Sequence, residues 1–462
     1  MAGMSDLFDA HPYQDRYPVQ RGLPEQGRPK AEILAELREM AALENQAWET
    51  GQCSGTMYCG DLDHYAFLTE AFGLFAHQNA LQRDMCPSAT RFEGEIIAMT
   101  ADMLHAPEAA GVLTSGGTES LMNPMLVARE RGRERGITRP NVVMPVTAHP
   151  ALLKGAHYFG IEVRHAAVTD RFVADMDSVR SLVDDDTVSL VGSAGTYPHG
   201  LVDPIAELSD LAVERDTLLH VDGCLGGFIL AWGEDLGYPV PVFDFRLPGV
   251  TSISADTHKY GFGLKGSSVL LYRSAELRRH QYFIVPDWPG GLYTSPGMSG
   301  SRSGGIIAAA WAAMVTLGRS GYRAIAADIF ATAAAVRRAV EAVPELRVLG
   351  DPFFNVAFST TEESGLDIFL VNDFLASRRW RMNGLQRPSA LHFCITRPNT
   401  QPGVVDRFAA DLVGAVAYAR EKAGTPARSG AFYAGGVTTE QITSGMEWWL
   451  DATQAVPAAP AP

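Results

Sequence analysis

Residues 254–261 of this 462-residue chain read Ser-Ala-Asp-Thr-His-Lys-Tyr-Gly, and this stretch is the most informative part of the sequence. Small and apolar residues at 251–255 predict a strand, and a glycine-punctuated turn leads to a second predicted strand at 268–272. Lys259 is therefore expected on a turn at the end of a buried strand. A lone lysine is usually a solvated surface charge. A desolvated lysine amine instead has a lowered pKa and can attack an aldehyde.

A second feature is a glycine turn that opens a helix. Residues 112–120 read Val-Leu-Thr-Ser-Gly-Gly-Thr-Glu-Ser, and a helical pattern continues to Arg135. The free N–H groups and the helix dipole at such a turn favour an anion, for example a phosphate. The alternative is a simple helix start, capped by Thr118 and stabilised by Glu119. Pro124 removes a backbone donor in the second turn, so we expect a local kink there.

A third feature is a short buried strand that ends in an acid, at residues 218–223 (Leu-Leu-His-Val-Asp-Gly). By itself, Asp222 before a glycine is more often part of a turn. An aspartate at the carboxyl end of a strand can also keep the ring nitrogen of pyridoxal phosphate protonated, so that the ring accepts electrons. The order of phosphate turn, aspartate and lysine favours this second interpretation, with Lys259 forming the Schiff base.

With these residues and further segments, the chain resembles the sphingosine-1-phosphate lyases, within the pyridoxal-phosphate-dependent group II decarboxylase superfamily of fold type I. The run from 250 to 259 is the most specific part of the resemblance, which spreads from about residue 30 to 440. The matching segments are 114–120, 149–160, 220–228, 243–272, 287–305 and 391–396. The resemblance implies an aspartate aminotransferase-like α/β fold, in which a mostly parallel sheet has helices on both faces and a smaller C-terminal α+β lobe follows.

The resemblance also implies roles for single residues. Lys259 would bind pyridoxal 5'-phosphate covalently, Asp222 would pair with its ring nitrogen, and His149 would stack on the ring. Ser301, in a glycine-rich loop, would reach the active site of the partner subunit in a homodimer. The residues implied to hold the cofactor phosphate are Gly117, Thr118 and His258, and Ser115 and Gly116 are also expected to bind the cofactor.

The reaction depends on which bond at the substrate Cα stands perpendicular to the cofactor ring, because only that bond overlaps the π system as it breaks. A retro-aldol cleavage needs a base for the β-hydroxyl and, in these lyases, a positive pocket for the substrate phosphate. Three catalytic candidates resemble the lyase pattern: Tyr58, Lys265 and His199. The alternatives are a packed aromatic, a surface charge and a turn residue, respectively.

The expected activity is that of an aldehyde-lyase acting on a phosphorylated β-hydroxy amine. A long-chain base phosphate would give an aldehyde and phosphoethanolamine. The main alternative is a pyridoxal-phosphate-dependent amino-acid decarboxylase, and a transaminase is less favoured. A catalytically silent cofactor-binding or scaffold protein would have lost Lys259 or Asp222, and both are present.

Residues 79–87 depart from the lyase pattern, which has Asn-Pro-Leu-His-Pro-Asp ahead of Phe-Pro. This chain reads Asn-Ala-Leu-Gln-Arg-Asp-Met-Cys-Pro, with Gln82 in place of the histidine and Cys86 in place of an aromatic residue. Glutamine cannot carry a charge or shuttle a proton. Either Arg83 makes an anionic contact in its stead, or the substrate differs from the usual one of the family.

Composition limits the classes of partner. The net charge of −15 disfavours nucleic acid or an anionic membrane as the main partner. Five scattered cysteines without metal-ligand spacing predict reduced thiols in a cytoplasmic protein and no metal site. No apolar run is long enough for a membrane span, and no signal peptide is recognisable.

The chain is expected to form one catalytic unit. A helix is predicted at 31–48, and a long helical stretch is predicted at 305–343. Strands that alternate with helices predict a mostly parallel sheet, at residues 142–146, 188–193, 218–221, 253–255 and 269–272. The expected segments are an N-terminal arm and helix (1–70), a large cofactor-binding domain (71–330), a small C-terminal domain (331–450) and a disordered tail rich in Ala and Pro (451–462).

Overall fold

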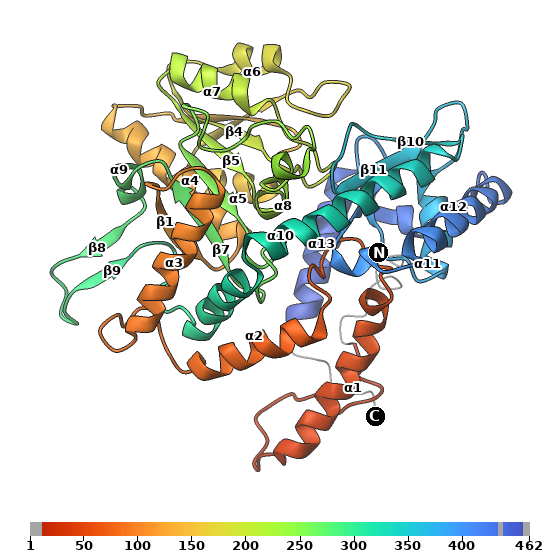
Figure 1. The fold of residues 1–462 in the computed structure, drawn as a ribbon, viewed down its shortest axis with the longest axis horizontal. Coiled ribbons are helices and arrows are strands. Elements are labelled where there is room, and N and C mark those ends of the chain that lie inside the picture. The colour runs from red at the N-terminus through yellow and green to blue at the C-terminus, as the bar shows by residue number, and fades with distance from the viewer. Residues whose placement is uncertain (1–11, 433–437, 456–462) are drawn as a thin grey trace.

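The computed structural model describes residues 12–432 and 438–455. Its large domain contains a seven-stranded sheet in the order β1-β7-β6-β5-β4-β2-β3 (Figure 1). The strands are β1 (Ala110–Thr114), β2 (Asn141–Pro145), β3 (Glu162–Ala166), β4 (Thr187–Ser193), β5 (Leu218–Asp222), β6 (Ser252–Ala255) and β7 (Ser268–Tyr272). Strand β7 is antiparallel to β1 and β6, and the other neighbours are parallel. The predicted mostly parallel sheet is confirmed.

Both faces of the sheet are covered by helices, as consecutive residues of β2 show. Val142 and Met144 pack with Leu121 and Leu152, whereas Val143 points into the main core on the opposite face. Side chains alternate across a strand, so the helices that supply these partners lie on different sides. One side has α4 (Gly117–Glu134) and α5 (Pro150–Phe159), and the other has α3 (Pro87–Met103), α6 (Met176–Leu182) and α7 (Ile205–Glu214).

The small domain is α+β, as expected. Its antiparallel sheet has the order β10-β11-β13-β12, and its core includes Phe358, Phe393 and Phe408. The elements are β10 (Leu346–Val348), β11 (Asn355–Thr360), α11 (Ile368–Ser377), β12 (Asn383–Leu385), β13 (Ala390–Cys394) and α12 (Val404–Glu421). The long α10 (Gly304–Glu341) leads from the large domain into this lobe, with a break in helical geometry at Gly318.

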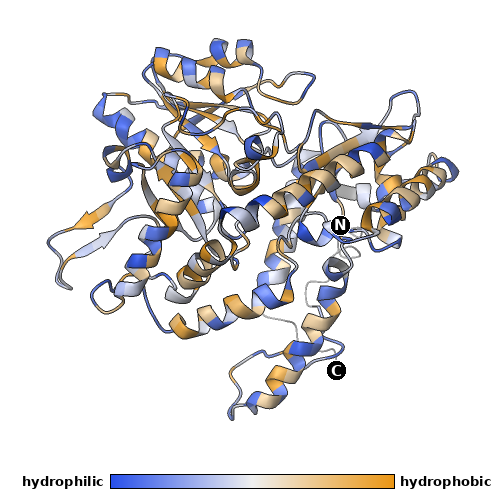
Figure 2. Ribbon diagram, in the orientation of Figure 1, coloured by the Kyte–Doolittle hydropathy of each residue, from blue (hydrophilic) through white to orange (hydrophobic). Residues whose placement is uncertain are grey.

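Several elements extend away from the two cores (Figure 1). The hairpin of β8 (Phe283–Val285) and β9 (Tyr293–Ser295) projects from the large domain, and Figure 2 shows the apolar residues of β8 on it. The remaining helices are α1 (Lys30–Glu49), α2 (Leu62–Phe75), α8 (Gly227–Leu230), α9 (Ala275–Arg279), α13 (Thr439–Gln454) and the 3-10 turns Glu234–Leu236, Arg397–Thr400 and Ser429–Phe432.

The structure bears on the predicted disordered tail and on the search for membrane-spanning helices. Helix α13 continues to Gln454, so the predicted disorder of the tail is wrong for its first residues, and 456–462 lie outside the described residues. None of the helices within residues 12–432 and 438–455 combines the length and the hydrophobicity that a membrane span requires.

Candidate active site

The predicted cofactor residues gather around one cavity of about 380 Å³. It lies beyond the carboxyl ends of β1, β5 and β6, where open α/β sheets bind their ligands. Seven predicted residues line it: Ser115, Gly116, Gly117, Thr118, His149, His258 and Lys259. Cys224, Asp256 and Glu119 also line this cavity, and they were not predicted as site residues.

The glycine turn is built to present backbone N–H groups. Gly116 has φ 148°, which L side chains rarely adopt, and a Cβ on Gly117 would lie 2.8 Å from Oδ2 of Asp256. No side chain caps α4, so capping by Thr118 is wrong. The Glu119 carboxylate instead accepts hydrogen bonds from the Ser115 N–H and hydroxyl, at 2.8 and 2.7 Å. Glycines and an uncapped helix start fit a phosphate.

Helix α4 contains Pro124 and continues to Glu134. The helix runs through this position as one element, so the proline does not end it. The amino terminus of α4 therefore lies at the glycine turn, where the positive end of the helix dipole favours a bound anion.

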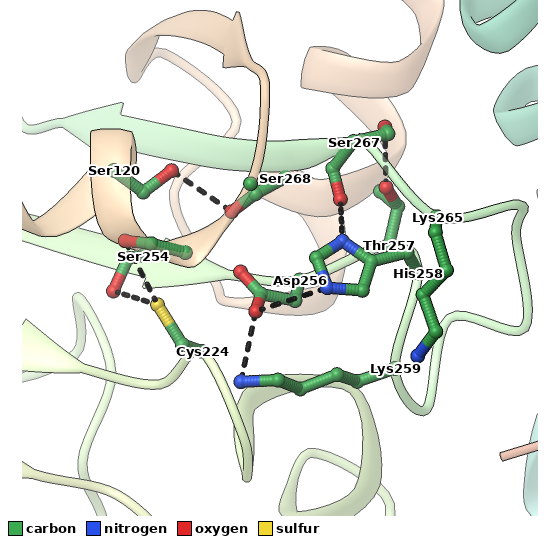
Figure 3. Close-up of polar contacts among 12 residues, drawn as sticks. Ser120, Cys224, Ser254, Asp256, Thr257, His258, Lys259, Lys265, Ser267 and Ser268 are labelled. Carbon is green, nitrogen blue, oxygen red and sulfur yellow. Dashed lines mark hydrogen bonds and ion pairs between the residues drawn. The ribbon is translucent and has the colours of Figure 1, made fainter. Parts of the chain in front are cut away.

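Lys259 lies on the turn after β6, and its ammonium points at a buried acid (Figure 3). The Lys259 Nζ is 2.9 Å from Oδ2 of Asp256, and Nε2 of His258 is 3.8 Å from the same oxygen. Burial opposes the charge of Lys259, but the Asp256 carboxylate outweighs it and raises the pKa. The pKa lowering expected from desolvation alone is therefore wrong for this structure.

His258 is fixed by the strand that follows it. Its Nδ1–H donates to the backbone carbonyl of Ser267 at 2.5 Å, which leaves Nε2 facing Asp256 (Figure 3). Burial lowers the pKa of His258, although Asp256 opposes that effect. In this neutral form Nε2 carries no proton, so His258 would bind a phosphate in the cavity only after it takes up a proton, which the negative charge of the phosphate favours.

Asp222 and His149 come from neighbouring parts of the sheet edge. Asp222 is the buried last residue of β5, and its Oδ1 accepts the N–H of Cys224 at 3.0 Å. His149 begins α5, and its Nδ1 accepts the N–H of Ala151 at 3.1 Å. Burial lowers the pKa of His149, and the charge of Asp222 opposes this. His149 lines the cavity, whereas Asp222 is not among its lining residues and contacts Cys224, which is.

Tyr58 and Lys265 line a second, smaller cavity of about 190 Å³ that shares His258 with the first. The Lys265 Nζ lies 4.8 Å from the Tyr58 ring centroid and donates to the Thr56 carbonyl at 2.9 Å. Lys265 is exposed in the single chain, yet desolvation of its ammonium and repulsion by Lys259 lower its pKa to about 8. The structure thus brings a cation beside the cofactor cavity.

His199 is not brought to either cavity. It is buried in the turn between β4 and α7 and stacks on Phe172, with ring centroids 4.6 Å apart. Burial, together with His392, lowers the pKa of His199 to about 4. Its environment is that of a packed neutral imidazole.

Ser301 lies near the glycine turn of its own chain. It shares a cavity of about 170 Å³ with Ser115 and Gly266, and Asn79 donates to its hydroxyl at 2.9 Å. The turn that begins at Asn79 also carries Gln82, which is exposed.

The other two unusual residues of that turn do not face the cofactor cavity. Arg83 forms an ion pair with Glu93 at 3.5 Å, so a substrate contact in place of the missing histidine would have to compete with this pair. Cys86 is buried at the start of α3.

The sequence contained signals for the residues that were missed. Asp256 is a charged residue at the end of an otherwise uncharged strand, three positions before Lys259. Cys224 follows Asp222 by two positions, and Glu119 follows the glycine pair by two. Each signal is short, and the direction of each side chain is set by the turn that carries it.

Comparison with known proteins agrees with this geometry. A family model, the pyridoxal-dependent decarboxylase conserved domain, matches residues 12–360. The sphingosine-1-phosphate lyase of Oryza sativa subsp. japonica is 43% identical over 380 residues, which cover 80% of this chain and 69% of that protein. The sphingosine-1-phosphate lyase of Dictyostelium discoideum is 38% identical over 410 residues, covering 88% and 76%.

Solved structures show the same similarity. A sphingosine-1-phosphate lyase structure from Burkholderia pseudomallei matches with a TM-score of 0.91 and 52% identity, covering 97% of this chain and 100% of that one. A glutamate decarboxylase from Lactobacillus brevis matches with a TM-score of 0.77 at 20% identity, covering 90% and 98%. The second match shows the fold alone.

Proposed function

Because this chain belongs to the sphingosine-1-phosphate lyase family of pyridoxal-dependent decarboxylases, we propose that it cleaves a long-chain base phosphate by a retro-aldol reaction. The products would be a long-chain aldehyde and phosphoethanolamine. The chain is a lyase that depends on pyridoxal 5'-phosphate. When bound, this cofactor supplies the electron sink for the carbon–carbon bond that breaks.

The chain's own residues would hold the cofactor at three points. The glycine turn and His258 would bind its phosphate, and Lys259 would attach to its aldehyde. Asp222 would pair with the ring nitrogen and His149 would stack on the ring. The uncapped start of α4, the φ of Gly116 and the convergence of the glycine turn, His149, His258 and Lys259 on one cavity support this assignment.

The single observation that carries the lyase assignment is the Tyr58 and Lys265 pocket. The Lys265 amine has a pKa of about 8, so it is mostly protonated near neutral pH. It lines a cavity that has His258 in common with the cofactor cavity. It can bind the substrate phosphate while Tyr58 faces the same space. His199 would act on the β-hydroxyl only if it left its stack on Phe172, so its catalytic role stays a prediction.

The decisive experiment identifies the products. The purified protein is mixed with a long-chain base phosphate, and separately with amino acids, and the products are analysed by mass spectrometry. Aldehyde and phosphoethanolamine in equal amounts support the proposal, with a Lys259→Ala variant as the control. Carbon dioxide from an amino acid, without aldehyde, would instead establish the decarboxylase alternative.

The assembly belongs to the proposal as well. We propose a homodimer whose Ser301 loop reaches the partner's site. Phe283, Ile284 and Leu292 of the adjacent hairpin are apolar and exposed in the single chain, which supports a partner subunit that covers this surface. A cytoplasmic location, a small-molecule amine as the main partner and the two-domain division at about residue 330 also remain predictions from the sequence.

A further inference from the structure

Asp256 is a buried carboxylate for which the proposed function has no use. Its side chain is 1% exposed, and its nearest charged atom is the Lys259 Nζ, 2.9 Å away. Neither of its oxygens accepts a backbone N–H from the described residues, and the Ser268 hydroxyl contributes less than Lys259 to keeping this carboxylate ionised. A buried carboxylate is costly unless it is paired. Its compensation therefore comes mainly from Lys259.

A buried acid with a structural role has different surroundings in this same protein. Asp203 is also fully buried, and its two oxygens accept the backbone N–H groups of Ala174 and Ser193 at 2.9 and 2.8 Å. Asp256 has no such backbone clamp in the described chain and instead packs against the glycine turn, at Gly117. Its position is explained by the lysine it faces.

We propose that Asp256 is the counter-ion that receives the Lys259 ammonium whenever this lysine is not bonded to the cofactor. The inference rests on the proposed attachment of the cofactor at Lys259. That attachment is opened each time a substrate amine takes the place of the lysine. The released side chain then needs a fixed position close to the reacting carbon, and Asp256 provides it as a positioning residue.

The ion pair also controls when Lys259 reacts. To bond to the aldehyde, the ammonium first releases one proton. The neutral nitrogen then attacks the aldehyde carbon, a carbon–nitrogen double bond forms, and the carbonyl oxygen leaves as water. The net reaction of one ammonium and one aldehyde thus gives the bonded product, one water and one proton. An anion beside the ammonium favours the charged, unreactive form.

Other titratable groups face the ion pair from neighbouring elements. They are Tyr58, Glu119, His149, Asp222, Cys224, His258 and Lys265. Burial raises the pKa of Tyr58 and Cys224 and lowers that of His149 and His258, so these four are neutral near pH 7. Glu119 is engaged by Ser115. Asp256 is therefore the carboxylate in direct contact with the lysine.

The test measures the reactivity of Lys259 in the cofactor-free protein. An amine-acylating reagent is added at pH 7.5, and the modification of Lys259 is followed by peptide mass spectrometry. The Lys259 side chain is 24% exposed, so the reagent can reach it. In Asp256→Asn, we expect acylation of Lys259 to be about tenfold faster or more, since an opposite charge at this distance shifts a pKa by about 1–3.

Lys154, exposed on α5, is the internal reference in the same sample, and its rate should not change. A Lys259 rate that is unchanged or slower in Asp256→Asn, at a constant Lys154 rate, overturns the proposal. If the variant does not fold, the wild-type protein gives the answer. The rate of Lys259 relative to Lys154 should then be low at pH 7.5 and rise with pH, and a ratio that stays constant across that range contradicts the ion pair.

A second measurement separates this inference from its premise. Pyridoxal phosphate is added back at several pH values, and its incorporation is followed by absorbance. The bond is then reduced with borohydride and located by peptide mapping. The pH at which incorporation becomes fast should fall in Asp256→Asn. Cofactor found on Lys259 with an unchanged pH profile overturns the counter-ion role, whereas cofactor on another lysine overturns the attachment itself.

Discussion

The side-chain amide of Asn79 donates a hydrogen bond to the Ser301 hydroxyl at 2.9 Å, although 222 residues separate them in sequence. The Asn79 carbonyl oxygen also accepts the N–H of Arg302 at 3.1 Å, and an isolated bridge pairs Asn79 with Ser303. The turn that carries Gln82 is thereby fixed to the glycine-rich loop. A partner subunit that receives Ser301 would receive Gln82 with it.

Subunit exchange tests whether the loop completes the partner's site. Lys259→Ala and Ser301→Asp variants should each be inactive, because one lacks the attachment residue and the other places an acid beside the cofactor phosphate. In random hybrid dimers, one of the two sites regains both native residues if the sites are shared. We expect roughly one quarter of the wild-type activity after mixing. If each site is built from one chain, mixing restores nothing.

Lys259→Ala also has a spectroscopic consequence. The purified wild-type protein with bound cofactor should be yellow, and the variant should lack the absorbance of the lysine-bound cofactor and all turnover. The variant should still fold, because alanine leaves the β6 strand intact, but its thermal stability should fall, because buried Asp256 loses the ammonium it faces. Absorbance spectra, circular dichroism and product analysis check these three outcomes. A variant that keeps multiple turnover contradicts the attachment at Lys259.

The sequence predicted the strands and the sheet edge better than it predicted side-chain partners. Uninterrupted apolar runs such as β5 are typical of strands buried on both faces, and the ends of parallel strands meet at one edge. The ammonium of Lys259 could not be placed in this way. A turn sets its direction, and the choice between desolvation and a counter-ion depends on Asp256, which is a side-chain position.

His199 illustrates the same limit. Its neighbours in sequence resemble those of the lyases, but in the folded chain its ring stacks on Phe172 from a different turn. The proposed partner contact of the Ser301 loop shows a further limit, because that prediction rests on the family resemblance and not on any pattern in the residues themselves. Patterns along one sequence carry no information on contacts that form across a two-fold axis.

Lys265 should make binding of a phosphorylated substrate depend on pH. With a pKa of about 8, its ammonium is present below pH 8 and is lost as the pH rises through that value. The KM for a phosphorylated substrate should therefore increase above pH 8, whereas that for an unphosphorylated analogue should not. In Lys265→Ala, KM for the phosphorylated substrate should be about tenfold higher at pH 7, since a charge-assisted contact contributes about 1.5–3 kcal/mol.

Lys265→Arg is the matched variant for this prediction, because the guanidinium stays protonated throughout the range. It should retain phosphate binding and remove the rise in KM above pH 8. Steady-state kinetics from pH 6.5 to 9.5 give all three profiles. Equal effects of Lys265→Ala on both substrates would show that the residue does not contact the phosphate.

Asp203 should make the stability of the fold depend on pH in the opposite sense to an ordinary paired acid. Burial, aided by the charge of Asp222, raises the pKa of Asp203 to about 6 despite the N–H groups of Ala174 and Ser193. The folded state thus holds the proton more tightly than the unfolded state. Asp203 therefore contributes about 3 kcal/mol to the free energy of unfolding below about pH 4, and this contribution is lost as the pH rises to 6.

Thermal unfolding of wild type and Asp203→Asn between pH 4 and 7.5 measures this contribution. The wild type should lose stability relative to the variant as the pH rises. Asp184→Asn is a control of opposite sign, because Arg164 outweighs burial and lowers the pKa of Asp184 to about 2. The wild type should gain stability over that variant as the pH rises from 2 to 4. A pH-independent difference for Asp203→Asn would contradict the raised pKa.

Gln82→His tests the position where this chain departs from the lyases. Gln82 is exposed in the described chain, so the substitution should change stability by less than about 0.5 kcal/mol. An imidazole can carry a charge and move a proton, which an amide cannot. If the turn reaches the partner's site, Gln82→His should preserve kcat/KM for a phosphorylated substrate or raise it up to about tenfold, since one charge-assisted contact has that value. Gln82→Ala, measured beside it, should not raise kcat/KM. An equal gain in kcat/KM for phosphorylated and unphosphorylated substrates would place the new side chain away from the phosphate. Release of carbon dioxide from an amino acid, unaffected by Gln82→His and by Lys265→Ala, would favour the decarboxylase.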